Sequence, residues 1–190
     1  PSQAEVLEKW ASRLRVEAKL FQKIAFVHAM AATEDGVLET VLDGVTETNK
    51  AYKKGDYIVE GASLHERYTM AANKFLKLYD VANAEDARTD KLANEGFMWY
   101  RPKGMIWGHQ LTEHETKTHF PTGSFQASWG EMMLVDPGDF LSMPFPEAAE
   151  IYRIQAKAFT TSYGPISEDE AHERIRQQAT VIRKARENRT

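Results

Sequence analysis

The sequence of 190 residues contains no cysteine and no apolar run long enough to span a membrane as a helix. The absence of cysteine excludes disulfide bonds, thiolate metal sites and cysteine nucleophiles, and it suits a reducing compartment, so we expect a cytoplasmic protein. Excess positive charge is also lacking. The net charge is -4, which argues against a general electrostatic grip on nucleic acid. We therefore expect no membrane partner, and nucleic acid is not the favoured partner.

Motifs that mark common catalytic and nucleotide-binding sites are absent as well. The chain has no Gly-x-Ser-x-Gly or Ser-x-x-Lys element, no phosphate-binding P-loop and no Gly-x-Gly-x-x-Gly fingerprint. Acyl transfer and nucleotide chemistry lack their usual anchors, and we expect no cofactor. What the chain does contain is 42% hydrophobic residues, enough to build a proper core.

A series of short motifs occurs twice in the same order. Each series has Gly-Asp followed by an aromatic and an aliphatic residue, then Glu-x-Tyr, then a phenylalanine and a tyrosine. The first is Gly55-Asp56-Tyr57-Ile58, Glu66-Arg67-Tyr68, Phe75 and Tyr79; the second is Gly138-Asp139-Phe140-Leu141, Glu150-Ile151-Tyr152, Phe159 and Tyr163. The glycines are 83 residues apart and the later members 84 apart, while upstream residues 24–30 match 105–111 at an offset of 81. We interpret this pattern as an internal duplication.

The predicted elements indicate an α+β protein made of two tandem β-rich repeats, each a small barrel or rolled sheet, in a pseudo-twofold arrangement. An N-terminal helix is expected within residues 1–21, because Ser2 and Glu5 form a capping box ahead of apolar residues at helical spacing. The first repeat is assigned to 22–80, a linker or polar helix to 81–96, and the second repeat to 97–164. A C-terminal helix is expected within 165–190, after a second capping box at Ser167 and Glu170.

The two Gly-Asp pairs are predicted to be structural turns. Gly55 and Gly138 permit a positive φ, and the carboxylates of Asp56 and Asp139 can accept hydrogen bonds from nearby backbone N–H groups. These residues could instead line a ligand site. The structural interpretation is favoured, because such a turn before an apolar strand needs no ligand to explain it.

At these motifs the chain resembles the small, poorly characterised bacterial and phage proteins that share a Pro-Gly-Asp-Tyr-Gly signature. Residues 136–141, with the following Glu-x-Tyr, Phe159 and Tyr163, resemble a full copy of the broader pattern. The first copy has Lys54 in place of the proline, and neither copy has glycine after the aromatic residue. The resemblance implies a compact β-rich domain and carries no established activity with it.

Two histidines stand at matching positions if the offset of 81 is correct. His28 has Phe26 on its own strand face and His109 has Trp107, so a shared ligand site between the repeats is conceivable. The repeated tyrosines Tyr68 and Tyr152 are further candidates to contact a ligand. The alternative, which we favour, is that these are hydrogen-bonded or packed core residues.

A second group of potential ligands lies at His109, His114 and His119, with two glutamates between them. Histidine and carboxylate side chains suit zinc, manganese or iron. Steps of five residues, however, place the histidines neither on one strand face nor one helical turn apart. We therefore expect an exposed hairpin or loop here and no metal.

These observations favour a non-catalytic module that binds a small molecule or a protein partner. One alternative is an enzyme with an unrecognised His/Glu site at the interface of the two repeats. Another is a structural subunit of a larger assembly, and a homo-oligomer is possible.

Overall fold

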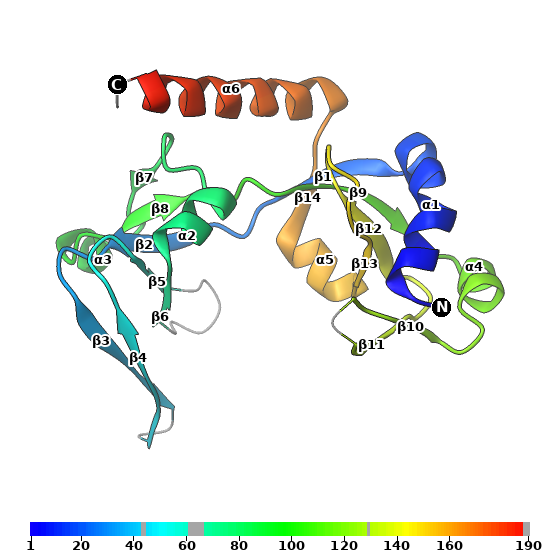
Figure 1. The fold of residues 1–190 in the computed structure, drawn as a ribbon, viewed down its shortest axis with the longest axis horizontal. Coiled ribbons are helices and arrows are strands. Elements are labelled where there is room, and N and C mark those ends of the chain that lie inside the picture. The colour runs from blue at the N-terminus through cyan, green and yellow to red at the C-terminus, as the bar shows by residue number, and fades with distance from the viewer. Residues whose placement is uncertain (43–44, 61–66, 129, 188–190) are drawn as a thin grey trace. The chain divides into compact units, whose positions relative to one another are not determined.

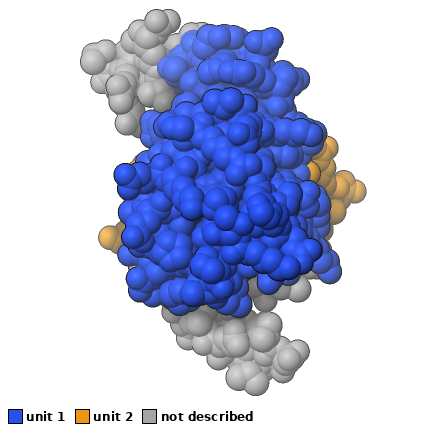
Figure 2. Space-filling view, turned by 90° about the vertical axis from the view of Figure 1, so that its right-hand side faces the viewer, with its two compact units in different colours: residues 1–23, 104–190 blue, residues 24–103 orange. Residues whose placement is uncertain are grey.

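The computed structural model describes residues 1–42, 45–60, 67–128 and 130–187, and it is an α+β structure (Figure 1). The chain forms two compact units: unit 1 comprises Pro1–Lys23 and Gly104–Thr190, and unit 2 comprises Ile24–Lys103 (Figure 2). This division differs from the linear order expected from the sequence. The N-terminal helix and the strand after it pack with the second half of the chain. Within the described residues, no sheet closes into a barrel, so the sheets are open.

Unit 1 begins with helix α1 (Gln3–Glu17), and the predicted capping box of Ser2 and Glu5 is confirmed. Val6, Trp10 and Leu14 lie on one helical face and are buried. The helix stops at Ala18, whose backbone is extended, and strand β1 (Lys19–Lys23) follows. The helix expected within residues 1–21 therefore ends at Glu17, and Phe21, which continues the helical spacing, belongs to a strand.

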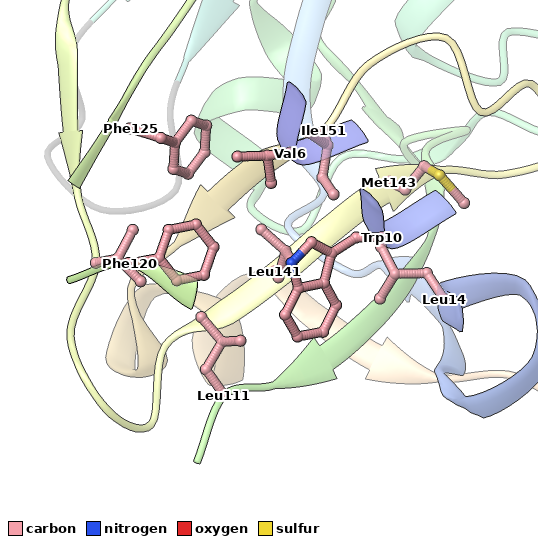
Figure 3. Close-up of a cluster of buried hydrophobic side chains, with 10 residues drawn as sticks. Val6, Trp10, Leu14, Leu111, Phe120, Phe125, Leu141, Met143 and Ile151 are labelled. Atoms are coloured by element: carbon pink, nitrogen blue, oxygen red, sulfur yellow. The ribbon is translucent and has the colours of Figure 1, made fainter. Parts of the chain in front are cut away.

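The sheet of unit 1 has five antiparallel strands in the order β13-β12-β9-β1-β14. The bounds of the remaining strands are β9 (Met105–Gln110), β12 (Phe140–Pro144), β13 (Tyr152–Ile154) and β14 (Tyr163–Pro165), and a separate hairpin consists of β10 (Ser124–Gln126) and β11 (Met132–Leu134). One sheet face packs against α1, and Figure 3 shows the buried side chains gathered there, including Trp10, Leu141, Met143 and Ile151. The other face meets Phe159 of helix α5 (Ala156–Ser162), under which Gly108 leaves room for the ring.

Two further helices complete unit 1. Helix α4 (Glu113–His119) starts at a capping box of Thr112 and Glu115, so the expectation of a loop here was wrong. Helix α6 (Glu168–Glu187) follows the predicted capping box, in which Ser167 and Glu170 exchange hydrogen bonds. No helix in the described part of the chain is long and apolar enough to cross a membrane.

Unit 2 also has a sheet of five antiparallel strands, in the order β6-β5-β2-β8-β7. The strands are β2 (Val27–Ala31), β5 (Tyr57–Glu60), β6 (Arg67–Met70), β7 (Glu85–Asp86) and β8 (Met98–Tyr100), and a separate hairpin consists of β3 (Gly36–Leu42) and β4 (Val45–Tyr52). Helix α2 (Ala72–Leu78) packs Phe75 on one sheet face. Helix α3 (Asp90–Asn94) packs Leu92 on the other, so the segment expected to be a linker or a polar helix contains a short strand and a short helix.

The two Gly-Asp corners have the same geometry. Gly55 and Gly138 both have φ of 90°. One carboxylate oxygen of Asp56 accepts the N–H of Lys53 and the other that of Ala72, at 3.0 and 3.3 Å. In the same way, Asp139 accepts the N–H groups of Asp136 and Ala156, both at 3.1 Å. Each aspartate thus links the turn before a strand to the first residue of the following helix through two hydrogen bonds.

Aromatic rings stack beside each corner in the same order. In unit 2, Tyr57 stacks on Phe75 with ring centroids 3.8 Å apart, and Phe75 stacks on Tyr79 at 4.7 Å. In unit 1 the corresponding distances, from Phe140 to Phe159 and from Phe159 to Tyr163, are 3.6 and 5.2 Å. A further ring stands edge-on to the central phenylalanine in each unit: Tyr100 at 89° and Phe21 at 85°.

The strand registers correct the proposed match between the two histidines. The aspartates of the two corners provide a common reference point for aligning the sheets. The N–H of Ala32 donates to the carbonyl of Asp56, and the N–H of Leu111 donates to the carbonyl of Asp139. These two donors are 79 residues apart, not 81. His28 therefore shares its register position with Trp107, and His109 shares its position with Met30. The histidines are not equivalent, and they belong to different units.

Candidate functional site

A row of polar and aromatic side chains crosses the whole sheet of unit 2. The antiparallel registers pair Arg67 with Glu60, Glu60 with His28, His28 with Trp99, and Trp99 with Glu85. Directly opposed residues project from the same face, so these five side chains form one continuous line. Ile58 and Phe97 share that face and pack with Leu92 of α3. The row therefore lies on the α3 side of the sheet.

The same register positions in unit 1 are apolar. Met143 corresponds to Glu60, Trp107 to His28 and Leu20 to Trp99, with Met143 paired to Trp107 and Trp107 to Leu20. Ile151, next to β13, corresponds to Arg67 and is 0% exposed. Helix α1 covers this side in unit 1, with 15 residues against five in α3. Unit 1 therefore has hydrophobic residues at the register positions where unit 2 has charged and polar ones.

His28 occupies the centre of the row and is held in its neutral form. Its Nε2 accepts the backbone N–H of Arg88 at 3.1 Å, which requires that this nitrogen carry no proton. Burial lowers the pKa of His28; the charge of Glu60 raises it and that of Arg88 lowers it. The imidazole lies 4.4 Å from the ring of Trp99, which also contacts Phe26 at 5.4 Å. The candidate residues His28 and Phe26 thus join one aromatic cluster.

A pocket of about 600 Å³ opens at the Arg67 end of the row. Its lining consists of Glu60, Arg67, Thr89, Lys91, Leu92 and Glu95. Arg67 lies between two carboxylates, with Nε 3.1 Å from Glu60 and Nη2 2.7 Å from Glu95, and its guanidinium covers the ring of Phe97. Glu60 is only 8% exposed. A buried carboxylate is costly unless it has such partners, so its presence here calls for an explanation.

A second cluster of ionisable groups lies in unit 1 between α1 and α4. Glu115 accepts hydrogen bonds from His109 at 3.0 Å, from Arg13 at 2.5 Å and from the backbone of Thr112 at 2.9 Å. Burial alone would raise the pKa of Glu115, but these bonds outweigh it and lower the pKa to about 2. Trp10 packs beside His109, and the guanidinium of Arg13 lies over the indole ring of Trp10. These hydrogen bonds join α4 to α1, and they occupy both carboxylate oxygens of Glu115 as acceptors.

The histidines considered as metal ligands are not arranged around a common point. His119 stands edge-on to Trp10, its Nδ1 has no hydrogen-bond partner in the described structure, and burial lowers its pKa. His114 is exposed on α4. Among the described residues, no group of three or more histidine or acidic side chains could hold a metal ion.

The other candidate residues have structural surroundings. Tyr68 hydrogen-bonds Tyr79, whose pKa is raised to about 12 by burial first and by this neighbour second. Burial likewise raises the pKa of Tyr152, which hydrogen-bonds Tyr163. Trp107 packs against Phe145 at 4.8 Å. The two tyrosines thus extend the aromatic stacks of their own units, whereas Trp107 packs on the α1 side of its sheet.

Comparison with known proteins adds no functional assignment: no family model, no curated protein and no solved structure matches the chain. The polar row and its pocket therefore have to be interpreted from their own chemistry.

A second pocket, of about 420 Å³, lies beside the start of α1 in unit 1. Its polar lining is largely engaged within the protein. Gln3 donates to the carbonyl of Ile151 at 2.6 Å and accepts the N–H of Ser128 at 3.0 Å. This pocket is consequently a weaker candidate than the one in unit 2.

The sequence pointed to His28 of the row and to its neighbour Phe26, but not to the other four members of the row. Glu60, Trp99 and Glu85 come from three strands that are separated by long stretches of sequence. One local signal was available: Glu60 ends a strand of otherwise apolar residues, Tyr57-Ile58-Val59, where the second motif series has Met143.

Proposed function

We propose that the protein is a non-catalytic binding module, made of two copies of one α+β unit, that holds a small ligand in the unit 2 pocket. The observation that carries the proposal is the replacement of an apolar row in one sheet by a charged and aromatic row in the other. Ion pairs at low exposure seldom improve stability over hydrophobic residues of similar size. A ligand gives these charges a reason to be retained.

Internal duplication is supported by features that the two sheets share. Both sheets have the same strand order, the same corner hydrogen bonds and the same ring stacks. The pairing of β1 with β9 also corresponds in register to that of β8 with β2. A helix precedes the strand in each case, α1 before β1 and α3 before β8. On this proposal, each copy contributes its first strand to the sheet of the other copy.

Binding is favoured over catalysis by the state of the acid-base groups. In unit 1, Glu115 closes a capping box and pairs with Arg13, so its contact with His109 has a structural explanation. In unit 2, Nε2 of His28 is occupied by the N–H of Arg88. In both arrangements the histidine Nε2 already has a hydrogen-bond partner within its own unit.

The experiment copies the residues of unit 1 into unit 2. The double variant Glu60→Met with Arg67→Ile reproduces Met143 and Ile151. We expect it to fold with a midpoint in urea equal to or above that of the unaltered protein, because a partly buried ion pair becomes hydrophobic packing. Native mass spectrometry should detect a small molecule on the unaltered protein that is missing from the double variant.

The control variant Glu113→Gln removes one partner of an exposed ion pair on α4 and should retain the ligand. Retention of the ligand by the double variant would contradict the proposed site. Unfolding of the double variant would show that the charges are needed for the fold and would remove the main support for the proposal.

A further inference from the structure

The charged groups that line the unit 2 pocket are balanced in sign. Glu60 and Glu95 supply two carboxylates, and Arg67 and Lys91 supply two cations. Thr89 and Leu92 add a hydroxyl group and an apolar surface. A pocket lined in this way has no net charge with which to attract an anion or a cation alone.

The two signs also lie close together. Arg67 bridges Glu60 and Glu95: its Nε lies 3.1 Å from Glu60 and its Nη2 lies 2.7 Å from Glu95, so both carboxylates contact the same guanidinium group. These ion pairs involve two of the three guanidinium nitrogens, and the stacking on Phe97 holds the group in place. The pocket therefore presents carboxylate oxygens and N–H donors side by side.

From this arrangement, and given the proposed binding function, we infer that the ligand is a small zwitterion of the amino-acid class. Its ammonium group binds the carboxylates of Glu60 and Glu95, and its carboxylate binds Lys91 and Arg67. A ligand with only an anionic group would bring that group close to two carboxylates without a cation to offset the repulsion. A ligand with only a cationic group would be repelled in the same way by Arg67 and Lys91. Like-charge contacts of this kind are how a site rejects the wrong partner.

The pocket size fits the same class. A volume of about 600 Å³ lies within the range of small-molecule sites, roughly 300–1,000 Å³. Leu92 provides an apolar wall for a ligand side chain. Phosphate-rich ligands fit less well, because the carboxylates offset the positive charge that such ligands need.

The test uses isothermal titration of the full chain with the free L-amino acids and three derivatives of each. The N-acetyl derivative keeps only the carboxylate, the amide keeps only the ammonium group, and the N-acetyl amide has neither. For at least one side chain, we expect the free amino acid to bind at least tenfold more tightly than any of its derivatives.

Two variants assign the charges to residues. Lys91→Gln should reduce the preference for the free amino acid over its amide by at least threefold, because the cation facing the ligand carboxylate is gone. Glu95→Gln should reduce the preference over the N-acetyl form in the same way. The matched controls Lys117→Gln and Glu113→Gln alter an exposed ion pair in unit 1 and should change neither ratio.

Equal binding of a free amino acid and its derivatives would overturn the ligand class. The same conclusion follows if no amino acid binds while native mass spectrometry detects another molecule that is lost in the Glu60→Met/Arg67→Ile variant, although the proposed binding function would then stand. If the double variant loses nothing and no amino acid binds, the ligand class and the site both fail.

Discussion

Asp139 and Asp56 show how one carboxylate can set the geometry of a strand and a helix together. Each accepts a backbone N–H from the turn ahead of its strand and another from the first residue of the following helix. Helices α2 and α5 have no side-chain cap of their own. The aspartate satisfies one of the N–H groups that the helix itself cannot pair.

Asp139→Ala should therefore lower the free energy of unfolding by about 1–3 kcal/mol, the range for losing a capping and turn acceptor. The effect should exceed that of Asp56→Ala, because Asp139 is only 3% exposed and also lies 3.6 Å from Arg153. Urea unfolding followed by circular dichroism gives both values. The control is Asp136→Ala, at an exposed neighbour. A loss of stability in Asp139→Ala as small as that of the control would contradict the proposed role of the two hydrogen bonds to Asp139.

Glu115 gives a second prediction at the residue scale, concerning pH. Its pKa is lowered from 4.5 to about 2 in the folded protein, so the unfolded chain binds its proton more readily. The stabilisation, about 3 kcal/mol by linkage, is fully present above pH 4.5 and is lost as the pH falls toward 2.

Glu115→Gln should accordingly destabilise the protein at pH 7 and make a progressively smaller difference between pH 4.5 and pH 2. Urea titrations at several pH values measure this. The nearby Glu113→Gln should cost less than about 0.5 kcal/mol, because its pair with Lys117 is exposed. A constant difference between the Glu115 variant and the unaltered protein across this range would contradict the assigned cause.

At the scale of elements, the sequence predicted those whose signals are local. The helices α1 and α6 begin at capping boxes that can be recognised from four residues. Thr112-Glu113-His114-Glu115 is the same signal, but the polar segment that contains it was interpreted as an exposed hairpin or loop, so α4 was not predicted. Strand β1 was missed because Phe21 fits the helical spacing of α1, while its true partners lie in β9 and β14.

The candidate site was less predictable because it depends on register. His28 and Phe26 were identified, but an offset of 81 matched His28 to His109 instead of Trp107. A shift of two residues keeps the same strand face and so leaves the hydrophobic pattern intact. Only the hydrogen bonds at the corners determine the offset of 79, and only the cross-strand pairs bring Glu60, Trp99 and Glu85 into line with His28.

The segment that leads into α3 should respond to pH through His28. Nε2 of His28 accepts the N–H of Arg88, and Thr89 then caps α3 by accepting the N–H of Leu92. A protonated imidazole cannot accept the first of these bonds. Glu60 favours the protonated form, while Arg88 and burial oppose it, and burial is the largest effect, so the folded pKa lies below 6.5.

The Arg88 amide should then lose protection from hydrogen exchange, by up to about tenfold per pH unit, as the pH falls from 6.5 to the lowered pKa. Protection should be constant above that window once exchange rates are corrected for intrinsic pH dependence. His28→Gln retains an acceptor and should abolish the change, whereas His114→Gln on α4 should preserve it. A pH response that survives in His28→Gln would assign it to another group.

At the scale of the whole molecule, the order of strands means that neither sheet is continuous in sequence. Strand β1 lies between β9 and β14 in unit 1, and β8 lies between β2 and β7 in unit 2. The chain passes from unit 1 to unit 2 after Lys23 and returns after Lys103. Residues before and after the exposed Val81–Asn83 stretch therefore contribute to both units.

This topology predicts the behaviour of a chain cut between Ala82 and Asn83 through an engineered protease site. The fragments 1–82 and 83–190 should elute together from a sizing column in native buffer and separate in urea, because separation removes an interior strand from each sheet. In an arrangement where β1 paired with β2 and β8 with β9, each fragment would keep its own sheet. Phe21 stands edge-on to Phe159 at 4.7 Å, so Phe21→Ala should weaken the association of the cut fragments while the uncut variant stays folded. Two folded fragments that elute separately would exclude the exchanged arrangement.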